Sequence, residues 1–337
     1  MRGELDRALE LAENNRAIAE TSGDRLMRLA ARLGLWQTHF FRGELAAALH
    51  HLDEGEPLYD EVADRQAALV YGLDPKVAAL THRASVLWAL GSIDQALDLS
   101  LRAVEHARAL GFPMTTASAL VFAAWIRHCR REPDGCIEHA EAAMAHANEQ
   151  GLPYWIPIGL ELRGAALVER GEIERGIADL EQGLASWTEG ANLGRCRHLA
   201  HLAAAKTRAG RLGEARELLE QSKALIAATG ERYHEAEIQR LDAELVCAEA
   251  GGIDEASSDA RSRVEALLHD AIECAKRQGA RTLELRATMS LARLCGHGAA
   301  GSRARVRLAE LLASFREGFG TADLREARDL AEEKSSA

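Results

Sequence analysis

The chain has 337 residues and a net charge of −11, and 47% of its residues are hydrophobic, 28% charged and only 4% aromatic. This apolar content excludes a disordered chain, and the abundance of Ala, Leu, Glu and Arg favours helices. The acidic balance repels a phosphate backbone, so we expect no nucleic acid partner.

No stretch of the sequence points to export or to a membrane. The longest apolar run, residues 117–126, is shorter than the roughly 20 residues that a membrane span needs. The cysteines lack any Cys-x-x-Cys pair, as is usual for buried thiols in a reducing compartment, and are Cys129, Cys136, Cys196, Cys247, Cys274 and Cys295. We therefore expect a cytoplasmic protein without disulfides and without a membrane partner.

A short phrase, Gly-x-x-x-x-Ala, opens one Ala- and Leu-rich stretch after another. Clear copies begin at Gly3, Gly43, Gly91 and Gly210, and a near copy begins at Gly171. With three weaker copies, the starting positions lie about 40 residues apart, or slightly further where a loop is inserted, which indicates a helical-hairpin repeat. Gly suits the left-handed residue that ends one helix, and a small residue in the next helix lets its partner approach closely.

The repeat predicts an all-α, tetratricopeptide-like solenoid, a right-handed superhelix of about 15–16 helices in one domain. In chain order, the hairpin units lie near residues 1–22, 23–58, 75–110, 113–150, 153–189, 193–229, 231–279 and 280–315, and a capping helix follows at 322–333. Loop insertions are expected at 59–74 and 251–262. Pro75, Pro113 and Pro153 stand where helices begin, a position at which the missing N–H costs no hydrogen bond.

The first unit is incomplete, because residues 1–22 supply only the second helix of a hairpin. A stack of repeats that starts in this way has no cap on its first face. The sequence therefore predicts either a truncated start or the C-terminal portion of a longer protein.

Several stretches along the chain carry a resemblance to a known family. They are residues 71–77, which read Tyr-Gly-Leu-Asp-Pro-Lys-Val, 88–91, which read Trp-Ala-Leu-Gly, 94–97, 162–164, 230–231 with 235–237 and 240–241, 283–294 and 317–324. These stretches resemble the C-terminal tetratricopeptide-like region of bacterial proteins in which a class III adenylate/guanylate cyclase domain is followed by a predicted signal-transduction ATPase.

The resemblance implies a regulatory sensor or scaffold region whose catalytic partners lie in other domains. The chain contains no Gly-Lys pair and hence no Gly-x-x-x-x-Gly-Lys-Ser/Thr phosphate loop. We therefore expect no ATP hydrolysis from this chain and no enzyme activity of its own.

Tetratricopeptide stacks commonly bind partners on the concave surface that the first helix of each hairpin forms. The side chains projected onto that surface are Gln37, Phe40, Thr81, Trp88, Trp125, His128, Glu161, Arg197, Thr207, Arg286 and Arg293. Aromatic rings in the N-terminal half and arginines in the C-terminal half suit a peptide or an acidic ligand. In the alternative explanation, Trp88 and Trp125 fill the space between helices and the arginines form salt bridges with nearby carboxylates.

Two groups of side chains contain potential zinc ligands. They are His128, Cys129, Cys136 and His139 around one hairpin turn, and Cys196, His198 and His201 on one helix. Neither group has the spacing of a known zinc site, and a Cys–His nucleophile pair would have no marked oxyanion site beside it. We therefore expect no metal and no cofactor.

Together these features predict a non-catalytic repeat domain that binds a protein segment or a small-molecule effector on its concave face. In the leading hypothesis, the bound ligand shifts the equilibrium of an upstream ATPase or cyclase module. The alternative is a stand-alone adaptor that bridges two proteins through its concave and convex faces.

Overall fold

The computed structural model describes residues 4–64, 66–187, 192–294 and 299–332. Within these ranges the chain forms seventeen α-helices and one 3-10 turn, without any strand. None of the helices described combines the length and the apolar character of a membrane span. Gly3, Cys295 and the expected helix ends at 189, 296 and 333 lie outside the described residues.

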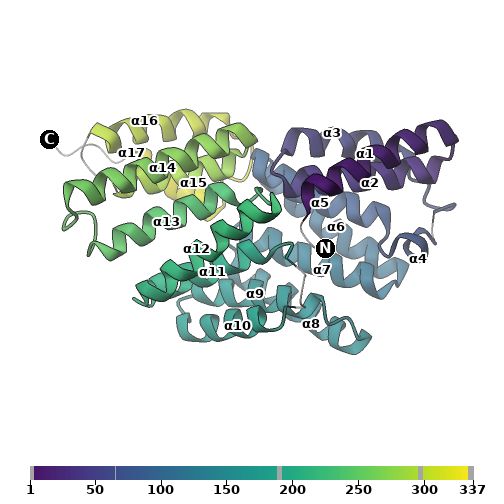
Figure 1. Cartoon of the computed structure of the whole chain (residues 1–337), viewed down its shortest axis with the longest axis horizontal. Helices are drawn as coiled ribbons and strands as arrows, with labels where there is room; N and C mark the ends of the chain where they lie inside the picture. The colour runs from purple at the N-terminus through teal and green to yellow at the C-terminus, as the bar shows by residue number, and fades with distance from the viewer. Residues whose placement is uncertain (1–3, 65, 188–191, 295–298, 333–337) are drawn as a thin grey trace.

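Figure 1 shows the helices in their order along the chain. They are α1 (Leu5–Ser22), α2 (Arg25–Phe41), α3 (Leu45–Gly55), η1 (Glu56–Leu58), α4 (Ala67–Tyr71), α5 (Pro75–Leu90), α6 (Ile93–Leu110), α7 (Pro113–Cys129), α8 (Pro133–Gln150), α9 (Trp155–Glu169), α10 (Ile173–Ala185), α11 (Arg195–Arg208), α12 (Leu212–Thr229), α13 (Glu235–Glu249), α14 (Ser258–Gln278), α15 (Arg281–Leu294), α16 (Ala299–Ser314) and α17 (Ala322–Glu332).

Successive helices pack in pairs, and the odd-numbered helices from α5 to α15 also pack against one another. These odd-numbered helices form the inner layer of the solenoid, and their hairpin partners form the outer layer (Figure 1). This arrangement confirms the all-α, tetratricopeptide-like fold that the repeat predicts.

Local sequence signals explain where the helices begin and why they pack closely. At α5, Pro75 occupies the first turn, and the side chain of Asp74 accepts a hydrogen bond from the Val77 N–H at 2.9 Å. In the repeat that begins at Gly171, the small-residue position is Gly176, where an added Cβ would lie 2.5 Å from the carbonyl oxygen of Gly164. A larger residue there would push α10 away from α9.

The structure differs from the sequence expectation in two loops. The segment 59–74 contains the short helix α4, which raises the number of described α-helices above the expected 15–16. The segment 251–262 is shorter than expected as a loop, because α14 already begins at Ser258. The Ser257 hydroxyl accepts from the Ala260 N–H at 3.2 Å, so a serine cap starts this helix early.

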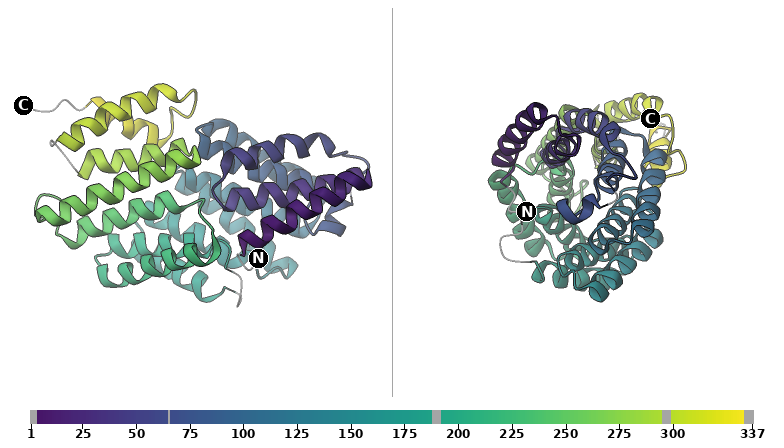
Figure 2. Two further views of the ribbon diagram at one scale, coloured as in Figure 1. Left: turned by 45° about the horizontal axis from the view of Figure 1, so that its top comes forward. Right: turned by 90° about the vertical axis from the view of Figure 1, so that its right-hand side faces the viewer.

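The helices wind around one axis, and segments far apart in the sequence meet after about one turn (Figure 2). The carbonyl oxygen of Phe41, at the end of α2, accepts hydrogen bonds from the N–H groups of Arg232 and Tyr233, just before α13. Helix α15 packs against α5. The Arg131 guanidinium, at the turn before α8, pairs with Glu326 of α17 at 2.8 Å. The superhelix is therefore closed on itself.

Candidate functional site

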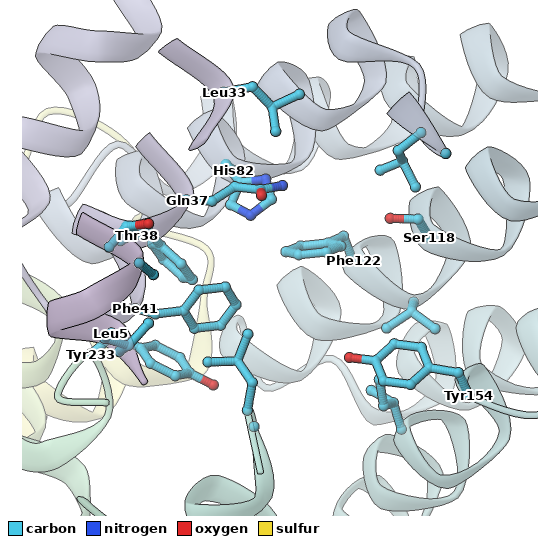
Figure 3. Close-up of a pocket in the computed structure, with 18 of the residues that line it drawn as sticks. Leu5, Leu33, Gln37, Thr38, Phe41, His82, Ser118, Phe122, Tyr154 and Tyr233 are labelled. Atoms are coloured by element: carbon cyan, nitrogen blue, oxygen red, sulfur yellow. The ribbon is translucent and has the colours of Figure 1, made fainter. Parts of the chain in front are cut away.

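A cavity of about 890 Å³ lies inside the superhelix. Its walls are mostly apolar, and its aromatic side chains are Phe40, Phe41, Tyr71, Phe122, Trp125, Tyr154, Trp155, Trp187 and Tyr233. Figure 3 shows Phe41 and Tyr233 on one side of the cavity, facing Phe122 and Tyr154 on the other. The two sides come from different parts of the chain, α2 and the start of α13 on one side, α7 and the start of α9 on the other.

The few polar groups in the cavity wall are neutral or already paired. His82 is buried, and its imidazole Nδ1 donates to the Ala78 carbonyl oxygen at 2.8 Å. Burial lowers the pKa of His82 to about 4, so the ring carries no charge at neutral pH. Gln37 and Ser118 add uncharged hydrogen-bonding groups.

The charged side chains in this wall are Glu4, Arg7 and Arg197. Only Arg197 is mostly buried, and a carboxylate neutralises it. Its Nε and Nη2 donate to the two carboxylate oxygens of Glu161 at 2.7 and 2.8 Å, and its Nη1 donates to the Tyr233 hydroxyl at 2.9 Å. Burial alone would raise the pKa of Glu161, but Arg197 holds that pKa well below its usual range. The pair is therefore ionised.

Beyond the cavity, aromatic rings and paired charges fill the axis of the superhelix. The ring centroids of Trp88 and Trp125 lie 6.3 Å apart, and both side chains are buried. The Arg286 guanidinium lies 5.3 Å from the Trp88 ring centroid and donates to Asp323 at 2.7 Å and to the Cys129 carbonyl oxygen at 2.7 Å. This part of the concave surface is packed core.

Most of the residues that the sequence projected onto the concave surface lie together around this axis in the structure. Of the projected set, those in the cavity wall are Gln37, Phe40, Trp125 and Arg197, and those in the adjoining packed cluster are Trp88, His128, Glu161 and Arg286. Arg293 does not join them, because its side chain is 44% exposed and pairs with Glu326 at 2.5 Å. The hydroxyls of Thr81 and Thr207 donate to carbonyls of their own helices.

Several residues of the cavity wall were not predicted from the sequence. Phe122 lies one helical turn before Trp125 on the same face of α7, so helical spacing could have included it. Tyr154 and Tyr233 precede the first residues of α9 and α13, and a projection of helix faces does not reach them. Tyr233 enters the cavity because its N–H is bonded to the end of α2.

Neither of the two zinc groups considered from the sequence assembles, because their side chains have other partners. The Cys136 thiol donates to the Leu162 carbonyl oxygen, the His139 Nδ1 bonds to the Gly135 carbonyl oxygen, and His198 Nε2 bonds to the Leu180 carbonyl oxygen. Where three possible ligands do converge in the described part of the chain, they lie on α1, α2 and α3.

No protein-family model matches the chain, and no curated protein matches it. Solved structures match its fold. The quorum sensor NprR in complex with its cognate peptide NprX has a TM-score of 0.57 and 14% identity over 98% of each chain. The apo form of NprR from B. thuringiensis has a TM-score of 0.50 and 16% identity over 97% of each chain.

A Rap protein complexed with competence and sporulation factor has a TM-score of 0.53 and 13% identity, over 85% of this chain and 76% of the Rap chain. At these identities, the similarity shows a shared tetratricopeptide-like solenoid fold. None of these matches supports the link to cyclase-associated ATPases that the sequence motifs suggest.

Proposed function

We propose that the chain is a non-catalytic sensor domain that binds a short peptide segment in its central cavity. The observation that carries the proposal is the cavity itself, about 890 Å³ in volume and lined by aromatic side chains from distant parts of the chain. Its size and apolar walls are typical of ligand sites in proteins. NprR, which shares the fold, has been solved with its cognate peptide, which favours a peptide as the occupant.

The chemistry of the wall favours uncharged, apolar side chains on that peptide. Arg197 is neutralised by Glu161, and His82 is neutral, so the buried part of the wall offers no spare charge for an acidic group. The exposed Arg7 and Glu4, which also line the cavity, pair with each other at 3.6 Å. Phe41, Phe122 and the neighbouring aromatic rings offer apolar surface, whose burial would drive binding. The peptide backbone can bond to groups such as Ser118 and Gln37.

Binding would be sensed through the closure of the superhelix. A peptide that contacts both Phe122 of α7 and Phe41 of α2 ties together two sides of the cavity that come from different hairpins. Any difference in affinity between a tighter and a looser superhelix then shifts the balance between the two shapes.

We further propose that this shift regulates a neighbouring ATPase or cyclase module. Support for this link comes from the motifs at 71–77 and 317–324, which resemble the region downstream of such an ATPase. This regulatory link requires that a reading frame upstream of the chain encodes a phosphate loop. Without such a frame, the stand-alone adaptor is favoured.

The binding proposal can be tested by selection from a pool of random peptides. Retained peptides are identified by mass spectrometry, and the affinity of the best one is measured for wild type, Phe122→Ala and Leu101→Ala. Phe122 lines the cavity, whereas Leu101 is an exposed side chain of α6 outside it. We expect Phe122→Ala to weaken binding roughly 10-fold or more and Leu101→Ala to leave it unchanged. Equal affinities for all three proteins would contradict the proposal.

A further inference from the structure

A second cluster of chemically active side chains lies outside the cavity, where α1, α2 and α3 pack together. Glu13 of α1, His39 of α2 and His51 of α3 each offer one ligand atom, and these atoms all lie within 4.8 Å of one another. The His39 and His51 side chains are 12% and 11% exposed, and Glu13 is half-buried. We infer that these three residues form a binding site for a zinc-like divalent transition metal.

The orientation of His39 supports a role as a ligand. Its Nδ1 lies 2.6 Å from Oε2 of Glu44, and the other oxygen of Glu44 accepts from the Arg42 Nε at 3.0 Å. A carboxylate on Nδ1 keeps the proton there and leaves the lone pair on Nε2 available. Histidines that bind metals commonly have this carboxylate partner, because it fixes the ring and strengthens the ligand.

His51 needs one local rearrangement before it can bind a metal. Its ring packs against that of His39, with the two ring centroids 5.2 Å apart. Its Nδ1 now lies 3.1 Å from Nη1 of Arg32 and 3.8 Å from Oε2 of Glu54. When Nε2 binds a metal, the proton moves to Nδ1. Arg32, which now donates to Nδ1 and pairs with Glu54 at 2.7 Å, must then move aside so that Glu54 can accept from Nδ1.

Glu13 completes the set with one oxygen to spare. Its Oε2 accepts from the Arg16 Nε at 2.8 Å, which leaves Oε1 for an ion. Two imidazoles and one carboxylate are a ligand set that suits zinc and disfavours Ca²⁺ and Mg²⁺, with a fourth position open to water. A bound ion would join α1 to α2 and α3. Because α1 supplies Leu5, Ala8 and Leu11 to the cavity wall, the ion would also hold that part of the wall in place.

The test uses the whole chain after removal of metal with a chelator. Zinc affinity and stoichiometry are measured by competition with a chromophoric chelator, and thermal unfolding is followed with and without zinc. We expect one zinc ion per chain and a higher unfolding midpoint when zinc is present. Glu13→Gln and His39→Gln should abolish both effects, and Glu44→Gln should weaken zinc binding roughly 10-fold, as expected for a residue that orients a ligand.

Two control variants address the other histidines. His50 and Glu54 form an alternative group with His51 on α3 alone, and His269 is exposed on α14. His50→Gln and His269→Gln should bind zinc like wild type, and circular dichroism should show all variants to be equally helical. Absence of stoichiometric binding, unchanged binding by His39→Gln, or loss of binding in His50→Gln but not in Glu13→Gln would overturn the inference.

Discussion

Arg197 and Glu161 form a bidentate ion pair at the centre of the superhelix, with N–O distances of 2.7 and 2.8 Å. The same guanidinium lies 4.5 Å from the centroid of the Trp125 ring. Glu161 is completely buried, and Arg197 contacts the cavity, so this pair joins the packed axis of the molecule to its ligand-sized space.

Removing one partner of this pair should strongly destabilise the protein. We expect Glu161→Gln to lower the free energy of unfolding by about 3–5 kcal/mol, because Arg197 is left buried without a counter-charge. Denaturant unfolding followed by circular dichroism measures the loss. The double variant Glu161→Leu with Arg197→Met should recover most of it, and a loss below about 1 kcal/mol in the single variant would mean that the pair is solvated.

The closure of the superhelix can be tested at Gly318. Its φ is +79°, its N–H donates to Oδ2 of Asp94 at 2.9 Å, and an added Cβ would lie 2.8 Å from the Cβ of Ile93. Glu317 accepts from the N–H groups of Asp94 and Gln95, which begin α6. We expect Gly318→Ala to separate this segment from α6 and to speed amide hydrogen exchange in α17.

Gly210 provides a matched control, with a φ of +74° and no atom within 4 Å of an added Cβ. Both alanine variants carry a similar backbone strain of about 1–2 kcal/mol, but only Gly318→Ala adds a clash. If hydrogen exchange in α17 is equally fast in Gly210→Ala, backbone strain alone explains the faster exchange, and loss of the contact between Gly318 and α6 does not.

Glu231 should make stability depend on pH in a direction unusual for a carboxylate. Both of its oxygens lie 3.0 Å from the Gly194 N–H, and it is fully buried. Burial raises the pKa of Glu231 to about 7, against the lowering effects of the Gly194 N–H and Arg197. Because the folded pKa is above the unfolded value, its contribution to stability is full below the unfolded pKa and is lost as the pH rises through 7.

The measurement compares wild type with Glu231→Gln in denaturant unfolding at pH 5 and pH 8. From pH 5 to pH 8, we expect the stability of wild type relative to the variant to fall by about 2–3 kcal/mol. A difference that is the same at both pH values would show that Glu231 has an ordinary pKa.

His82 should act in the opposite pH range. Burial lowers its pKa to about 4, although its bond to the Ala78 carbonyl favours the charged form. Its contribution is therefore present above the unfolded pKa and is lost as the pH falls through the folded one. Between pH 7.5 and pH 5, we expect wild type to lose about 2 kcal/mol more than His82→Gln in denaturant unfolding. The exposed His269→Gln should follow wild type, and equal losses in wild type and His82→Gln would contradict this explanation.

The hairpins were predictable because their signals are local. Pro75 and Asp74 lie at the start of α5, and the small Gly176 lies where α10 meets α9. Loop 251–262 was misjudged because the cap at Ser257 is a single side chain with no periodic signal. The closure was not predictable, since a repeat records contacts between neighbouring hairpins, whereas Arg131 and Glu326 are far apart in the chain.

The same distinction explains the candidate site. Helical phase placed Trp88, Trp125 and Arg286 on the inner face, and in the structure they lie together there. Helical phase could not show that Arg286 pairs with Asp323 of α17, or that Tyr233, which precedes α13, enters the cavity. Both features depend on contacts between segments that are far apart in the sequence.

Cross-linking to the selected peptide shows whether the peptide binds inside the superhelix. A photo-reactive amino acid is introduced in place of Phe122, at the cavity wall, or in place of Leu101, on the outside. We expect the bound peptide to be cross-linked from position 122 and not from position 101. A peptide that still binds both proteins but is cross-linked only from position 101, or from neither position, would contradict this expectation.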